Sequence, residues 1–126
     1  MADERLDKKL DRVRFGRMAE RLAALSLILS GWRILRRNWR AVGGEIDIVA
    51  RRGRVLAIIE VKARQTERAA LEALGPAQQA RIVQTTRALL ASNPGFDRYD
   101  VRFDVIVVRP WAWPRRISGA FDVAGR

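Results

Sequence analysis

Three charged residues lie inside two strand-like apolar runs in the first half of the sequence. They are Asp47 in GGEIDIVA and Glu60 and Lys62 in IIEVKAR. Burying an unpaired charge costs several kcal/mol, so a charge in such a place usually serves a purpose. Two carboxylates can bind Mg²⁺ or Mn²⁺, which activates water and a phosphodiester, while a lysine stabilises the negative charge that develops. The residue types therefore predict hydrolysis of a phosphodiester bond.

Strand geometry decides whether these three side chains meet. Glu60 and Lys62 are two positions apart, so they share one face of a strand, about 6.6 Å from each other. If the turn within 51–54 takes two or four residues, position 47 pairs with 58, and Asp47 is a diagonal neighbour of Glu60 about 7 to 8 Å away. A three-residue loop would place Asp47 on the other face. The predicted site depends on this register.

A structural alternative exists for the E-x-K pair. Such a pair within one strand is common by chance, and Glu60 and Lys62 could form a simple ion pair on a partly solvated face of the sheet. Taken alone, the pair favours that alternative. Asp47, the hairpin and the basic composition together favour a metal site.

The composition indicates one globular domain, residues 1–126, that binds a polyanion. The chain has 126 residues, of which 48% are hydrophobic, enough for one core and too few residues for two ordinary domains. Its 25 Lys and Arg against 14 Asp and Glu give a net charge of +11. Such an excess attracts nucleic acid through counterion release, so we expect a nucleic-acid partner, DNA first.

The absent residue types narrow the chemistry further. The sequence has no Cys and no His, which excludes thiolate nucleophiles, Ser-His-Asp triads and metal sites built on sulfur or imidazole. Oxygen ligands remain, and they favour hard ions such as Mg²⁺ or Mn²⁺. The most apolar run, 22–29, contains Ser26 and is far shorter than the roughly 20 residues that cross a bilayer. We therefore expect a soluble, cytoplasmic protein without a membrane anchor.

The elements around the candidate site predict an α/β fold, a central mixed β-sheet flanked by α-helices. A helix is predicted over 15–29, ending at Ser30-Gly31. The charged stretch 1–14 before it is either a solvated helical lead-in or a frayed terminus. The other predicted elements are strands at 32–40, 46–50, 55–63 and 101–108, a short helix at 66–74 and a longer one at 77–90.

Two further groups of side chains are assigned by pattern. The longer helix is expected to face the core with Ile82, Val83, Thr86, Leu89 and Leu90. The aromatic tail, 111–126, has no assigned element, and it carries Trp111, Trp113 and Phe121, for which packing in the core is expected.

The ordered set of motifs resembles a known family. Gly16 and Glu20, then GWRILRRNWR, GGEIDIVA, IIEVKAR and RFDVIVV resemble the YraN family of predicted endonucleases. That family is similar to archaeal Holliday junction resolvases and belongs to the restriction-endonuclease-like superfamily, whose catalytic pattern is an Asp followed by E-x-K. The resemblance covers about residues 15–108 and implies a restriction-endonuclease-like core. A resolvase would cut two strands symmetrically as a homodimer.

The resemblance implies a role for each residue of the central pattern. Asp47 and Glu60 would hold the metal, with the main-chain carbonyl of Val61 as a third ligand. Lys62 would be the catalytic lysine. Bound Mg²⁺ or Mn²⁺ is the implied cofactor.

Three more residues have roles that the resemblance implies. By helical periodicity Glu20 is at the edge of the apolar face, which is typical of a surface Glu paired with Arg17 or Arg21. The resemblance instead makes Glu20 a supplementary acidic residue of the site. Gln78 matches a position that is Lys or Gln in the family and is a further catalytic candidate. Asp104 in RFDVIVV is expected to have a structural role, with hydrogen bonds near the site.

Three functions follow from these observations. The first is a Mg²⁺-dependent endonuclease that cuts duplex, branched or damaged DNA. The alternative is a non-catalytic nucleic-acid-binding module on the same fold, which the net charge supports equally. A third, weaker hypothesis is an interaction protein that docks through the aromatic tail.

Overall fold

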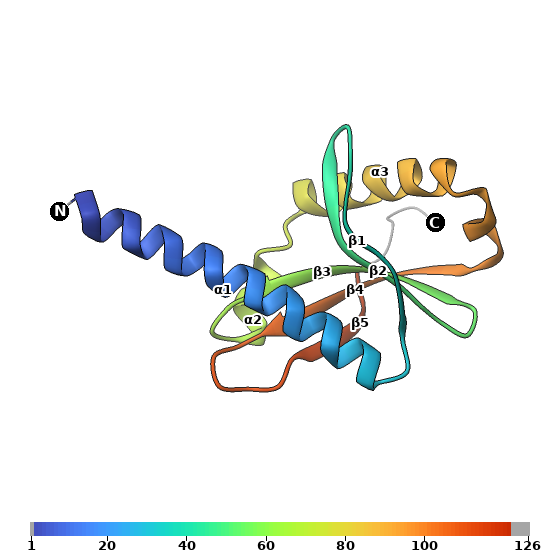
Figure 1. Cartoon of the computed structure of the whole chain (residues 1–126). Helices are drawn as coiled ribbons and strands as arrows, with labels where there is room; N and C mark the ends of the chain where they lie inside the picture. Colours follow the sequence, from blue (N-terminus) through green and yellow to red (C-terminus); the bar gives the residue numbers. More distant parts are fainter. Residues whose placement is uncertain (1, 122–126) are drawn as a thin grey trace.

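The chain folds around one mixed sheet, as the sequence predicts, although the sheet has five strands and only four were expected (Figure 1). This computed structural model describes residues 2–121, with side chains described for 4–8 and 14–121. The strands lie in the sheet in their order along the chain, and neighbours are antiparallel except for the parallel pair β3 and β4. The α/β architecture is consistent with a restriction-endonuclease-like core. The strands are β1 (Arg33–Ala41), β2 (Gly44–Arg52), β3 (Val55–Ala63), β4 (Asp100–Val108) and β5 (Arg115–Phe121).

Helices cover both faces of the sheet. Helix α1 (Ala2–Leu29) packs on one face, and α2 (Glu67–Glu72), α3 (Pro76–Ser92) and the short 3₁₀ helix η1 (Pro94–Arg98) belong to the crossover on the other (Figure 1). Side chains alternate along a strand, so in β3 Ala57 and Ile59 pack with α1, while Leu56 and Ile58 pack with α3. The continuous apolar run of β3 is thus explained by burial on both faces.

Helix α1 is longer than predicted. It begins at Ala2, so residues 2–14 are helical rather than frayed. It ends where predicted, because Gly31 adopts a left-handed φ of 87°. The N–H of Gly31 donates to Ile28 at 3.1 Å and that of Trp32 to Leu27 at 2.9 Å, the pattern of a Schellman cap. No helix within residues 2–121 is both long and apolar enough to span a membrane.

The crossover helices form with caps that their own sequence supplies. Oγ1 of Thr66 accepts the N–H of Ala69 at 3.0 Å, which caps α2. Pro76 occupies the first turn of α3, where its missing N–H removes no helical hydrogen bond. The five residues predicted to face the core do so: Ile82, Thr86 and Leu89 are buried, and Val83 and Leu90 are half-buried.

The β2–β3 hairpin differs in register from the prediction. Its two turn residues are Gly53-Arg54, and the ladder pairs Val49 with Ile58, so the predicted pairing of 47 with 58 is wrong. Gly53 has a φ of +61° and stands at the first turn position, which is typical of a type II′ hairpin. The error is two residues, so the predicted face of the strand is preserved and position 47 falls directly opposite Glu60.

Close packing of α3 on the start of β2 fixes one side of the site. A Cβ on Gly44 would lie 2.6 Å from Oγ1 of Thr85, which is buried and donates to the carbonyl of Arg81. We predict that Gly44→Ala lowers the free energy of unfolding by about 1–3 kcal/mol, the usual effect of overpacking, in urea titrations. A double-mutant cycle with Thr85→Ala should show that removing the hydroxyl relieves part of this loss; strictly additive effects would contradict the explanation.

The tail contains a strand that the sequence did not reveal. Strand β5 pairs antiparallel with β4, and Phe121 stacks on Phe103 with ring centroids 4.8 Å apart. The expected core packing of the tail is wrong for Trp111 and Trp113, whose exposed fractions are 104% and 58%. Residues 122–126 of the predicted tail lie outside the described residues.

Candidate active site

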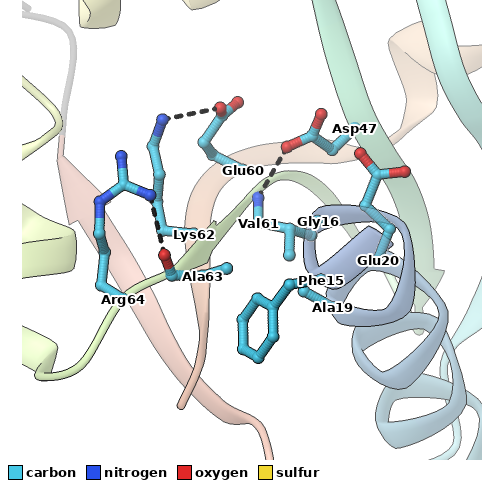
Figure 2. A pocket seen from close by; sticks show the side chains of 10 residues that line it. All are labelled: Phe15, Gly16, Ala19, Glu20, Asp47, Glu60, Val61, Lys62, Ala63 and Arg64. Atoms are coloured by element: carbon cyan, nitrogen blue, oxygen red, sulfur yellow. Dashed lines mark hydrogen bonds and ion pairs between the residues drawn. The ribbon is translucent and has the colours of Figure 1, made fainter. Parts of the chain in front are cut away.

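The site forms where the β2–β3 ladder ends. Its last paired residues are Ile48 and Ile59. Beyond them the N–H of Val61 donates to Oδ2 of Asp47 at 2.8 Å, so a carboxylate replaces a ladder carbonyl (Figure 2). The N–H and C=O of one strand residue face the same side, so the carbonyl of Val61 also faces the β2 side. That orientation suits its predicted role as a metal ligand.

Glu60 and Lys62 are neighbours on β3, as their spacing predicts. Nζ of Lys62 lies 3.3 Å from Oε1 of Glu60, and only 15% and 12% of the two side chains are exposed. The ion pair is therefore shielded from water, unlike a surface salt bridge. Both side chains line the same cavity as Asp47, and Glu60 lies between Lys62 and the carboxylate of Asp47 (Figure 2).

Helix α1 closes the other side of this cavity. The space measures about 600 Å³, and its lining joins Glu20 and Gly16 of α1 to Asp47, Glu60 and Lys62 of the sheet. The carboxylate of Glu20 points toward that of Asp47 (Figure 2). Glu20 is half-buried at this cavity, so the resemblance predicts its position better than the periodicity of the helix does.

Gln78 faces a second cavity on the α3 side. This space of about 280 Å³ is also lined by Asp47 and Glu60, and Arg81 of α3 contributes to it. The two carboxylates therefore lie between the cavities, and every predicted site residue lines one or both. Arg81, three positions after Gln78 on the helix, was not singled out from the sequence, although its i+3 spacing places it on the same face.

Glu45 and Asn38 are site residues that the sequence reasoning missed. With its amide nitrogen turned toward the carboxylates, Asn38 donates to Oε2 of Glu20 at 3.2 Å and to Oε1 of Glu45 at 3.1 Å. Oε2 of Glu45 also pairs with Nε of Arg40 at 3.4 Å. The spacing of Glu45 and Asp47, two residues apart in GGEIDIVA, contained the signal for Glu45. The sequence around Asn38 contains no pattern that identifies it as a site residue.

The acidic groups repel one another at short range. Burial, followed by the charge of Glu60, raises the pKa of Asp47 from 3.8 to about 7, against the opposing hydrogen bond from Val61. Burial also raises the pKa of Glu60, although its ion pair with Lys62 counteracts the shift. Glu20 and Glu45 push both values upward. The acidic side chains around the cavity thus repel one another more strongly than the positive charge of Lys62 compensates.

The raised pKa values make the metal-free protein sensitive to pH. Between pH 3.8 and about 7, folded Asp47 holds a proton that the unfolded chain releases, so its contribution to stability is full at low pH and is lost as the pH rises through 7. In EDTA, the free energy of unfolding of the parent relative to Asp47→Asn should fall over this range. Glu72→Gln, which changes an exposed side chain of α2, should keep the parent's slope. Parallel curves for parent and Asp47→Asn would contradict the prediction.

Asp104 is structural, as expected, and does not line either cavity. It is fully buried and accepts hydrogen bonds from Arg102, Arg116 and the N–H of Gly119. These bonds join β4 to β5. In the β3–β4 ladder Asp104 is paired with Ile59, the residue before Glu60, but neither Asp104 nor its hydrogen-bond partners line the cavities that contain the carboxylates.

The fold and the site define a class: an α/β protein whose central hairpin brings two acidic side chains and a lysine into one cavity beside a helix. The chain belongs to the uncharacterised protein family UPF0102, whose pattern it matches over residues 19–108. This is the YraN family that the sequence resembles.

Bacterial relatives support the family assignment over most of the chain. A UPF0102 protein of Methylocella silvestris is 45% identical over 108 residues, which cover 86% of this chain and 87% of the relative. One from Parvibaculum lavamentivorans is 47% identical over 108 residues, covering 86% and 81%. One from Sinorhizobium medicae is 43% identical over 115 residues, covering 91% and 94%. None of these names states an activity.

Proposed function

We propose that this protein is a metal-dependent endonuclease that hydrolyses phosphodiester bonds in DNA. The observation that carries the proposal is the convergence of Asp47, Glu60 and Lys62 on one cavity, with Glu20 facing them. A structural ion pair needs only Glu60 and Lys62. It does not account for the second carboxylate placed opposite Glu60 or for the excess negative charge around it.

The donor chemistry fits Mg²⁺ or Mn²⁺. The raised pKa of Asp47 means that its charge is unfavourable without a cation, and all the available donors are oxygens. Among the described side chains, no group of three or more acidic residues is arranged to enclose a metal alone. Mg²⁺ commonly keeps water and substrate oxygens as ligands, so Asp47, Glu60 and the Val61 carbonyl would be a sufficient protein contribution.

Each residue of the site would have a separate role in phosphodiester hydrolysis. A bound cation would polarise the phosphoryl group and acidify a water molecule. Lys62 places a positively charged amino group beside Glu60. That group can stabilise the negative charge that develops on the phosphate oxygens as the water oxygen bonds to phosphorus and one ester P–O bond breaks. Glu20 offers an acceptor for the proton of the attacking water, and the released alkoxide takes up a proton from solvent. The hydrogen bond from Val61 keeps Asp47 oriented toward the cavity.

The charge of the chain supports DNA as the substrate. Its net charge of +11 favours a polyanion, and Arg64 lines the cavity that holds the carboxylates. A phosphate entering this cavity would meet two cationic side chains, Lys62 and Arg64, beside the acidic group. Symmetric cutting of two strands would in addition require a homodimer.

The test is cleavage of labelled DNA in the form of a four-way junction, a flap, a plain duplex and a single strand, with Mg²⁺, Mn²⁺ or EDTA. We expect the parent to cut only with metal, and Glu60→Gln to cut at least about 100-fold more slowly. Glu72→Gln is the matched control, because it makes the same change on the exposed face of α2 and should cut like the parent. Equal cutting by parent and Glu60→Gln would refute the proposal.

The binding-module alternative has one observation in its favour. The Glu60–Lys62 ion pair and the Asp47–Val61 hydrogen bond give both carboxylates a partner within the protein itself. On that alternative, DNA binding would depend steeply on salt, ignore Mg²⁺ and survive Glu60→Gln, and none of the four DNA substrates would be cut.

A further inference from the structure

The loop between β4 and β5 presents a tryptophan in a conformation that tryptophan rarely adopts. Trp111 has a φ of 61°, and the N–H of Ala112 donates to the carbonyl of Arg109 at 3.4 Å across a turn with Pro110 at its second position. The third position of such a turn normally takes Gly, because φ is positive there. Here the turn holds the Trp111 side chain fully in solvent, with an exposed fraction of 104%.

The exposed side chain of Trp111 is not packed in the core, so packing does not offset the strain of its backbone conformation. Backbone strain of this kind is concentrated at functional sites, and a bulky residue at positive φ is an outlier. Trp113, two residues further along, is also 58% exposed. Exposed aromatic side chains grouped in this way mark a binding surface.

These two tryptophans line an apolar groove that adjoins the candidate active site. The groove measures about 500 Å³ and runs between the loop and α1, with Met18 and Leu22 of the helix in its wall. Phe15 and Ala19 line both this groove and the cavity that contains the carboxylates. A ligand can therefore occupy the two spaces at once.

We propose that Trp111 and Trp113 stack on unpaired bases of the DNA strand whose phosphate enters the active site. The inference rests on the proposed nuclease function and adds a substrate class to it, namely DNA with single-stranded or unstacked positions next to the cut. Exposed aromatic rings bind bases by stacking, without sequence preference. The bases of an intact duplex are already stacked and do not offer their faces.

The charges around the groove favour a nucleic-acid strand over a second protein chain. Arg109 lines the groove itself, and Arg64 lines the adjoining cavity. A strand laid across both would put its bases on the apolar side, against the tryptophans, and its phosphates near these guanidinium groups. This alternation of aromatic and cationic groups is typical of single-strand binding.

The test is a binding measurement in EDTA, where no cutting occurs. The DNA is a duplex with a short single-stranded gap carrying 2-aminopurine, compared with the same duplex without a gap. We expect the parent to prefer the gapped DNA and to quench its 2-aminopurine. Replacing both tryptophans, Trp111→Ala with Trp113→Ala, should weaken binding of gapped DNA by roughly 5- to 150-fold, the range of one stacked base, and abolish the quenching.

Two controls make the result specific. Trp111→Phe with Trp113→Phe keeps aromatic rings and should retain most of the preference. Leu29→Ala removes another exposed apolar side chain, 69% exposed at the end of α1, that does not line the groove, and it should bind both DNA molecules like the parent. Thermal unfolding of each variant establishes that the fold is kept.

The outcomes separate this inference from the proposed nuclease. Unchanged preference and quenching in the double Ala variant would overturn the stacking role, even if cleavage depends on Glu60. A double variant that binds DNA normally but loses a concentration-dependent dimer would also overturn it, because the groove would then bind a second copy. Loss of preference and quenching supports stacking, even if no DNA is cut and the nuclease proposal fails.

Discussion

Asp47→Asn should lower metal-dependent DNA cleavage by roughly 10²- to 10³-fold and at the same time stabilise the metal-free protein at pH 8. The amide oxygen of Asn can still accept the N–H of Val61, so the end of the ladder is kept. The neutral amide oxygen is a weaker ligand of a hard cation than a carboxylate oxygen, because it brings no negative charge. Its nitrogen can donate to the neighbouring carboxylate of Glu60, so repulsion is replaced by attraction.

The two effects have one cause, which is the charge of Asp47 in a crowded acidic cavity. Stability is measured by thermal unfolding in EDTA at pH 8, and cleavage in Mg²⁺ with the same preparation. The stabilisation should shrink as the pH falls and vanish only well below the unfolded pKa of 3.8, where Asp47 is protonated in both folded and unfolded parent chains. Asp97→Asn, an exposed site, is the matched control and should change neither quantity. A less stable Asp47→Asn that still cuts DNA would show that Asp47 is a structural residue.

The core of the site was predictable because strand periodicity is insensitive to small errors. Glu60 and Lys62 share a face for any register, and Asp47 shares it with them for any even shift. The predicted pairing was wrong by two residues, yet the side chains still meet. The sequence pattern did not show how the helices pack against the sheet. Only the packing of α1 against the sheet brings Glu20 to Asp47, so helical periodicity alone placed Glu20 on the surface.

The fold was predictable where apolar runs are long and ended by Gly or Pro. Each of the four strands expected from the sequence forms, and β3 is central. Strand β5 was not predicted from the sequence, because it has few buried side chains and contains Gly119 at a φ of 60°. Propensity favours burial of tryptophan, but the turn at Pro110 overrides it for Trp111. The missed features are thus those that depend on single backbone conformations or on long-range contacts.

Asp104 makes β5 part of the sheet despite that weak pattern. Its Oδ1 accepts Nε of Arg102 at 2.8 Å and the N–H of Gly119 at 2.9 Å, and its Oδ2 accepts Nη2 of Arg102 at 2.8 Å and Nη1 of Arg116 at 3.4 Å. The β4–β5 register shifts at this point. The two guanidinium groups also lie 5.6 and 5.2 Å from the ring centroid of buried Trp32. One carboxylate therefore organises the edge of the sheet.

Asp104→Ala should lower the free energy of unfolding by about 3 kcal/mol, because it leaves two arginines and a backbone N–H without their partner. Roughly 10 °C of melting temperature should be lost in a chain of this size. The estimate is below the maximum for a buried pair, since side-chain exposures of 32% for Arg102 and 26% for Arg116 let water replace part of the interaction. Thermal and urea unfolding at neutral pH measure the effect.

Asp104→Asn and Asp97→Ala separate the contributions. Asn keeps an acceptor for Gly119 but lacks the charge for the arginines, so it should fall between parent and Asp104→Ala. Asp97 is exposed, and its replacement by Ala should change stability by less than about 0.5 kcal/mol. Hydrogen exchange should locate the loss of protection of Asp104→Ala in β5 first, because that edge strand depends most on these bonds. An unchanged melting temperature would show that β5 is held by its apolar contacts with Phe103 instead, and uniform loss across all strands would show that Asp104 does not act through β5 in particular.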